Sequence, residues 1–184
     1  MKKILTIALI VALANLSAVS KKEAAAPAAL EVKQVAWKAH TYLVDRSVIA
    51  MKDLGAAFQD KMVKVFTYAQ TAKMQVEEPA AAGLYYTWDT TAGTTDVGIA
   101  VRLKETPKTS GSYSVITIPA SKALVVDYYG PYDKMGVAHD AIHKYAKDKG
   151  LKLTYPAIEE YVGDPGVETD PNKVLTKVYY LIGN

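Results

Sequence analysis

Two adjacent glutamates, Glu159 and Glu160, lie inside AIEEYV, a run of otherwise apolar and aromatic residues that predicts a β-strand. Burying a carboxylate is costly unless it gains a partner, so the pair is a candidate for chemistry. Because alternate residues of a strand face opposite ways, Glu159 and Tyr161 share one face. A carboxylate beside an aromatic ring suits an organic cation, which gains charge attraction and a cation–π contact of roughly 0.5 to 2 kcal/mol.

The sequence leaves two alternatives open for these glutamates. Both could be solvated on an exposed face of a sheet, with Tyr161 packing locally. Glu160 shares its face with Ile158 and Val162, which could equally form the wall of a pocket, so either glutamate is a candidate to line a cleft. A cleft glutamate such as Glu159 could also act as a general base toward water.

Tyrosine is the dominant aromatic residue, with 13 tyrosines against two phenylalanines and two tryptophans. A tyrosine ring is apolar but ends in a hydroxyl group, a combination common in the walls of ligand pockets. Tyr86 is the first choice because it precedes an aspartate by three residues, as Tyr161 does. Trp88 is its expected same-face neighbour, and Tyr128, two residues before a Gly-Pro turn, is a further choice. The wider aromatic set comprises Tyr85, Tyr86, Trp88, Tyr128, Tyr129, Tyr132, Tyr179 and Tyr180.

His139 and His143 are four residues apart in HDAIH, so a helix would place both on one side. This spacing can hold zinc or another transition metal, but the pattern offers no third ligand. We expect the two histidines to flank the apolar stripe of a helix, and we expect neither a metal nor a cofactor.

The elements that would position these residues occur in two similar series, offset by 75 residues (Ala50 to Val125) to 77 residues (Pro79 to Pro156). The first series comprises a strand at 47–51, a helix region ended by Pro79, and strands at 84–89 and 97–103. The second comprises a strand at 122–129, a helix stopped by Gly150, and strands at 157–162 and 174–182.

Strand, helix, strand, strand in duplicate predicts an α+β domain. Each series is too small to bury much surface alone, so we expect two pseudo-symmetric β-α-β-β repeats, at about 41–105 and 112–184, to join in one antiparallel sheet. The helices would lie on one face of that sheet. A junction between two such repeats leaves a central cleft, which is a common place for a ligand.

The N-terminal region predicts export. Residues 1–20 carry two lysines, then an uncharged apolar run and then small residues, which is the pattern of a cleaved signal peptide. The apolar run is shorter than the roughly 20 residues of a membrane-spanning helix, so we expect no stable membrane insertion after cleavage. Residues 21–40, which begin with KKEAAAPAAL, are the expected flexible linker and lead-in. We therefore expect a periplasmic or secreted protein.

Charge and cysteine content exclude several classes of function. Without Lys2 and Lys3 the 22 basic residues become 20, against 19 acidic residues, so the mature chain carries a net charge of +1. A nearly neutral chain without a dense basic run is not expected to bind nucleic acid. The chain has no cysteine, which excludes disulfides, thiolate metal ligands, a cysteine nucleophile and a lipidated cysteine.

Several of these segments together resemble the GyrI-like (gyrase-inhibitor-like) family of small-molecule-binding domains. They are DYYGPYDKM (127–135), PAIEEYVGDPG (156–166) and DPNKVLTKVYYLI (170–182), with VIAMKDLG (48–55), GLYYTWD (83–89) and TDVGIAVRL (95–103) in the first repeat. The resemblance covers about residues 41–182 and assigns 41–184 to this domain.

The resemblance implies a groove that accepts lipophilic, often aromatic and cationic, molecules. Glu159 matches the family's glutamate that meets the positive charge of the ligand. We therefore expect a small-molecule-binding protein without catalysis, which uses Glu159, Tyr161, Tyr86, Trp88, Tyr128 and Glu160. The alternatives are a hydrolase of strained electrophilic molecules that uses a cleft glutamate, and a haem binder similar to the SOUL proteins with His139 or His143 as ligand. The sequence identifies neither the ligand nor a protein partner.

Overall fold

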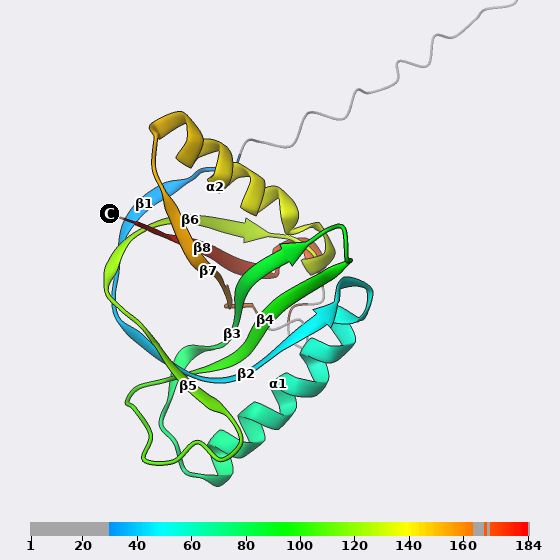
Figure 1. The fold of residues 1–184 in the computed structure, drawn as a ribbon, viewed down its shortest axis with the longest axis vertical. Coiled ribbons are helices and arrows are strands. Elements are labelled where there is room, and N and C mark those ends of the chain that lie inside the picture. Colours follow the sequence, from blue (N-terminus) through cyan, green and yellow to red (C-terminus); the bar gives the residue numbers. More distant parts are fainter. Residues whose placement is uncertain (1–29, 164–167, 169, 184) are drawn as a thin grey trace, which may run out of the picture.

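The computed structural model describes residues 30–163, 168 and 170–183, which contain one curled antiparallel sheet and two α-helices (Figure 1). The strands are β1 (Lys33–Trp37), β2 (His40–Ala50), β3 (Val76–Asp89), β4 (Thr94–Leu103), β5 (Ser114–Ile118), β6 (Ser121–Tyr129), β7 (Leu153–Tyr161) and β8 (Leu175–Ile182). The α-helices are α1 (Leu54–Thr71) and α2 (Gly136–Lys149), and short 3₁₀ helices lie at Met51–Asp53, Tyr132–Lys134 and Pro171–Lys173. The expected signal peptide at 1–20 lies outside the described residues.

The strands lie side by side in the order β1-β6-β8-β7-β3-β4-β2-β5. The two halves of this order correspond to each other. Counted outward from the centre, one half consists of β7, β8 and β6, and the other of β3, β4 and β2. Each half includes one α-helix, α2 in the first and α1 in the second. This order confirms an α+β fold built from two β-α-β-β repeats, with β1 and β5 added at the edges. The repeats join where β3 pairs with β7, from Ala82 opposite Glu160 to Tyr85 opposite Ala157.

One face of the sheet buries its apolar residues by curling around them. All eight strands of the described chain, and neither α-helix, contribute to the cluster on this face, which comprises Trp37, Tyr42, Val44, Ala82, Leu84, Ala100, Ile118, Ala123, Ile158 and Leu181. Only two residues separate β1 from β2, although these strands lie at or next to opposite ends of the sheet. The curl therefore brings the two ends together, as the arc of strands in Figure 1 shows.

The two α-helices cover the opposite, convex face. The side chains that α2 buries against the sheet lie four residues apart, at Ala138, Ile142 and Ala146. Gly150 ends α2 in the left-handed conformation, with φ of 64°, which confirms the predicted stop of this helix. α1 buries Val65 and Ala69 against β2 and β4. In the part of the chain that the structure describes, neither helix is long and apolar enough to cross a membrane.

The first helix ends earlier than the sequence predicts. α1 stops at Thr71, and Pro79 lies inside β3 rather than at the end of a helix region. The proline is tolerated because the pairing of β3 with β4 is interrupted between Val76 and Ala81, so its missing N–H costs no hydrogen bond of the sheet. The short edge strands β1 and β5 are absent from the prediction, and β1 occupies part of the range assigned to the linker and lead-in.

Replacing Ile142 by Ala should lower the free energy of unfolding by about 2 to 5 kcal/mol, because this side chain is fully buried between α2 and the sheet. Val137 lies on the same helix with 55% of its surface exposed, so Val137→Ala is the matched control. It should change the free energy by less than about 0.5 kcal/mol. Urea denaturation measures both values, and equal stabilities of the two variants would contradict this packing of α2.

Candidate functional site

A groove with a volume of about 1090 Å³ lies between the two α-helices and the convex face of the sheet. Its lining is mainly apolar. The helical side contributes Met51, Phe58, Met62, Phe66, Tyr132 and Met135, and the sheet contributes Tyr85, Trp88, Glu159 and Tyr161. Three of the five methionines of the chain thus face one groove.

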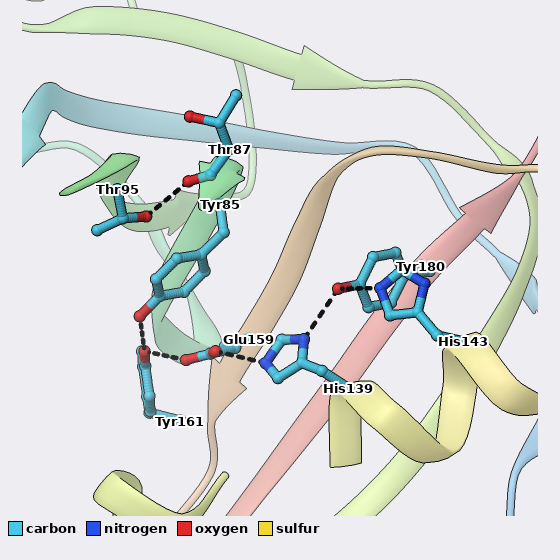
Figure 2. Close-up of polar contacts among 8 residues, drawn as sticks. All are labelled: Tyr85, Thr87, Thr95, His139, His143, Glu159, Tyr161 and Tyr180. Carbon is cyan, nitrogen blue, oxygen red and sulfur yellow. Dashed lines mark hydrogen bonds and ion pairs between the residues drawn. The ribbon is translucent and has the colours of Figure 1, made fainter. Parts of the chain in front are cut away.

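Glu159 lies on the floor of this groove, at the centre of the sheet. On β7 it is flanked by Gly83 of β3 and Val178 of β8, and only 5% of its surface is exposed. The Tyr161 hydroxyl donates a hydrogen bond to Glu159 Oε2 at 2.6 Å, and His139 Nε2 lies 2.9 Å from Oε1 (Figure 2). Because an ionised carboxylate only accepts hydrogen bonds, His139 donates from Nε2. Two hydrogen bonds thus fix the orientation of the carboxylate.

The hydrogen bonds continue on both sides of the carboxylate. On one side, the Tyr85 hydroxyl lies 3.2 Å from that of Tyr161. On the other, the Tyr180 hydroxyl lies 3.0 Å from His139 Nδ1 and 3.1 Å from His143 Nε2. Figure 2 shows the resulting row of side chains, which runs from the strands across to α2. The row connects the floor of the groove with His143, which is exposed to solvent.

Burial keeps the tyrosine hydroxyls of this row protonated. It raises the pKa of Tyr85 and the pKa of Tyr161 well above the usual value, and the negative charge of Glu159 raises both further. Burial likewise raises the pKa of Tyr180. The three hydroxyls are therefore uncharged near neutral pH and remain able to donate hydrogen bonds.

Aromatic rings surround the carboxylate. Tyr85 and Trp88 are stacked, with ring centroids 5.1 Å apart and planes inclined by 7°. Phe58 of α1 and Tyr132, just before α2, contact the ring of Tyr161 edge to face, with centroids at 5.0 and 5.3 Å. The groove therefore combines π-electron surface with a negative charge, which are the two features that attract an organic cation.

The charge of Glu159 has no permanent counter-ion within the described residues. The only basic side chain there within ion-pair distance is His139, which is charged only when protonated. A buried carboxylate without a permanently charged partner disfavours folding. Conflicts of this kind between burial and charge are expected at functional sites.

Three of the six residues chosen from the sequence line the groove together: Glu159, Tyr161 and Trp88. Tyr86 lies on the helix-free face instead, where Arg46 stacks over its ring with Cζ 3.4 Å from the centroid. Tyr128 packs into the core beneath α2, and its hydroxyl donates to the Pro131 carbonyl at 3.0 Å.

A β-bulge explains why Tyr85, rather than Tyr86, lies beside Trp88. The pairing of β3 with β4 shifts directly after Tyr85. Tyr85 pairs with Val97, and Trp88 pairs with Thr95. Because these two residues of β4 are two apart, they face the same side, and so do their partners. Strict alternation, which grouped Trp88 with Tyr86, does not hold across the bulge.

His139, Tyr85 and Tyr180 also belong to the site, but they are not among the six residues chosen from the sequence. The two tyrosines belong to the wider aromatic set, but alternation alone does not show which members of that set meet. The spacing of His139 and His143 does place both on one side of α2, where they contact Glu159 and Tyr180. Among the residues that the structure describes, no group of three or more His, Cys, Asp or Glu side chains could hold a metal ion.

Glu160 lies on the opposite face of β7, in a buried ion pair. Arg102 of β4 donates to Glu160 Oε1 at 2.7 Å and also to the backbone carbonyl of Glu78. Burial raises the pKa of Glu160, and the positive charge of Arg102 offsets part of this effect. The structure thus places Glu159 in the large groove and gives Glu160 a fixed partner, beside a separate cavity of about 320 Å³.

Residues 31–182 match the family model of the GyrI-like small molecule binding domain. The match covers most of the chain, and the chain belongs to this family. None of the curated proteins compared with the chain gives a significant match.

Solved structures share the fold. The C-terminal domain of EcmrR gives a TM-score of 0.73 at 18% sequence identity, over 84% of this chain and 98% of that domain. EcmrR in its complex with DNA gives 0.74 at 18% identity, over 85% of this chain, which spans only 58% of that one. SAV2435 bound to tetraphenylphosphonium gives 0.61 at 18% identity, over 84% of this chain and 94% of that one. At such identities the likeness shows the fold.

Gly83 leaves room for the tyrosine rings over the floor of the groove. A Cβ atom at this position would come within 2.6 Å of the Tyr85 ring and 3.0 Å of the Tyr161 hydroxyl. Gly83→Ala should therefore lower the free energy of unfolding by about 1 to 3 kcal/mol through overpacking. Gly136→Ala on α2, where a Cβ meets nothing within 4 Å, is the matched control and should not destabilise. Urea denaturation distinguishes the two, and a Gly83→Ala variant as stable as the wild type would contradict the close approach.

Arg102→Met should lower the free energy of unfolding by about 3 to 5 kcal/mol at neutral pH, because it leaves the Glu160 charge buried and unpaired. The pKa of Glu160 is raised in the folded state, so this carboxyl gains its proton there at a higher pH than in the unfolded chain. The loss of unfolding free energy caused by Arg102→Met should therefore shrink as the pH falls through that raised pKa. Denaturation of wild type and variant at several pH values measures this difference.

The control for this substitution is Arg46→Met, which breaks the more exposed ion pair with Asp96. It should lower the free energy of unfolding by no more than about 1 kcal/mol. A pH-independent loss in Arg102→Met, or equal losses in the two variants, would be inconsistent with a buried Glu160.

Proposed function

We propose that this protein is an exported small-molecule-binding protein whose groove captures a lipophilic aromatic cation, with Glu159 as the counter-charge. The position of the Glu159 carboxylate carries the proposal. It is nearly fully buried on the floor of a mainly apolar groove, and in the described chain it has hydrogen-bond donors but no permanently charged partner. Membership in a family of small-molecule-binding domains supports a binding role.

The surroundings of the carboxylate suit a cation that has no N–H group. A quaternary phosphonium or ammonium donates no conventional hydrogen bonds, so it depends on charge attraction and on contact with aromatic faces. The groove provides both, through Glu159 and through the rings of Tyr85, Trp88 and Phe58. An apolar lining also removes the hydrophobic part of such a ligand from water, at roughly 25 cal/mol for each Å² buried.

The size of the groove suits a ligand with several rings. Its volume of about 1090 Å³ lies at the upper end of the range of roughly 300 to 1,000 Å³ for small-molecule sites. SAV2435, which shares the fold, has been solved bound to tetraphenylphosphonium, a lipophilic cation with four phenyl rings. That ligand supports the proposed class of molecule for this chain.

The proposed export rests on residues 1–20, whose two lysines, apolar run and small residues follow the pattern of a signal peptide. Such a location would place the groove outside the inner membrane. The protein would then meet lipophilic cations before they enter the cytoplasm, and capture without chemical change would suffice to lower their free concentration.

Glu159→Gln should weaken the binding of methyltriphenylphosphonium at least about tenfold, or 1.4 kcal/mol. The reason is that the amide keeps the shape of the side chain but loses its charge. Triphenylphosphine oxide is a neutral molecule of similar size, and its affinity should change by less than about threefold. Trp88 lines the groove, so quenching of tryptophan fluorescence measures both affinities.

Two further variants serve as controls. Glu160→Gln changes the neighbouring carboxylate on the other face of β7, and Asp133→Asn changes an exposed carboxylate at the rim of the groove. Each should alter the phosphonium affinity by less than about threefold, because Glu160 lies on the other face of β7 in a pair with Arg102 and water screens the exposed charge of Asp133. Equal losses in Glu159→Gln and Glu160→Gln, or no binding of the phosphonium by the wild type, would refute the proposal.

A further inference from the structure

We infer that His139 determines which charge of ligand the groove accepts. While its imidazole is neutral, the Glu159 carboxylate is available to a cationic ligand. When His139 is protonated, its imidazolium neutralises the carboxylate, and the groove then favours an uncharged aromatic molecule. This role rests on the function proposed above, because it acts on the same carboxylate.

His139 is placed to compete with a ligand for Glu159. Its Nε2 atom lies 2.9 Å from Glu159 Oε1, its side chain is 14% exposed, and it lines the groove. Trp88 contacts the same ring edge to face, with centroids 5.2 Å apart. A cation that binds between Trp88 and the carboxylate therefore lies beside the imidazole. Two positive charges next to one carboxylate repel each other, so a charged His139 opposes the binding of a cation.

The residue type at position 139 decides whether the charge of Glu159 is neutralised by the protein itself. A lysine or arginine beside Glu159 would neutralise the carboxylate permanently, and a glutamine would never neutralise it. Histidine is the side chain whose charge changes within the range of about pH 5 to 8. A histidine at position 139 can therefore be either a neutral or a charged neighbour of the carboxylate.

While His139 is neutral, the hydrogen bonds on its side of the row all donate toward the Glu159 carboxylate. His139 donates from Nε2 to the carboxylate, so its Nδ1 atom carries no proton and accepts from the Tyr180 hydroxyl. The Tyr180 oxygen then accepts from His143 Nε2. When His139 gains a proton on Nδ1, both of these bonds reverse, and Tyr180 donates to His143 instead.

His143 is suited to receive the reversed hydrogen bond. Partial burial of its ring and the neighbouring His139 lower the pKa of His143, which favours its neutral form, and a neutral imidazole accepts at one of its two nitrogens. His143 is also exposed to solvent. The row that ends at Tyr180 and His143 thus accommodates both protonation states of His139 without leaving a buried group unpaired (Figure 2).

Other ionisable groups line the groove near His139 or lie along the row of hydrogen bonds that passes through it. They are Glu159 and Tyr161 of β7, Tyr85 and Glu78 of β3, Tyr180 of β8, Asp133 before α2, and Asp140 and His143 of α2 itself. The tyrosines stay uncharged because burial raises the pKa of each. Glu78, Asp133 and Asp140 are exposed, so water screens their charges. Glu159 is therefore the charge that dominates the environment of His139.

The test measures methyltriphenylphosphonium and triphenylphosphine oxide binding to the whole protein at about pH 5 and about pH 8. The wild type should bind the phosphonium at least about tenfold more weakly at the lower pH, and the oxide equally well or more tightly. In His139→Gln, the amide still donates to Glu159 but never gains charge, so the phosphonium affinity should change by less than about threefold. His40→Gln, which changes a histidine at the separate cavity beside Glu160, is the matched control and should keep the pH dependence of the wild type.

Each other outcome has a distinct meaning. Phosphonium binding that is independent of pH in the wild type would overturn the role of His139 and leave the cation-binding groove intact. An equal loss at low pH in the wild type and in His139→Gln would also overturn it, because Glu159 would then be the titrating group. No phosphonium binding by the wild type at about pH 8 would overturn the proposed function together with this role.

Discussion

The two hydrogen bonds that Tyr161 and His139 donate to the Glu159 carboxylate connect all parts of the site. They require that β7 lie at the centre of the sheet, that Gly83 on the neighbouring strand leave space for two tyrosine rings, and that α2 present its histidine to the strand. A carboxylate with weaker support would turn toward water. The fold of the two repeats is therefore what keeps a negative charge inside an apolar groove.

Consecutive glutamates on β7 show two solutions to the same electrostatic problem. Glu160 has a permanent partner, Arg102, and both are buried on the face around which the sheet curls. Glu159 has a partner, His139, whose charge depends on protonation. An extended apolar segment accommodates both carboxylates because strand alternation sends them to opposite faces, where Glu160 meets a guanidinium and Glu159 meets an imidazole.

The duplicated order of elements, the antiparallel sheet and the shared face of Glu159 and Tyr161 follow from periodicity, because these features depend on neighbouring residues along the chain. The misplaced helix end at Pro79 and the position of Tyr86 depend on interruptions of strand pairing, which alternation does not reveal. The contact of His139 with Glu159 joins residues 20 apart, on a helix and a strand. Contacts of this kind are set by packing, so the spacing of the two histidines indicated only that they share one side of a helix.

The curled sheet and the methionines of the helical wall have opposite mechanical properties. The two-residue link between β1 and β2 holds the ends of the sheet together, so the floor that carries Glu159 has little freedom to widen. Met51, Met62 and Met135 are unbranched and take up many shapes at little cost. The helical wall would thus adapt to molecules of different shape, while the floor would select them by charge. Tolerance of shape and selectivity for charge would then belong to separate layers of one fold.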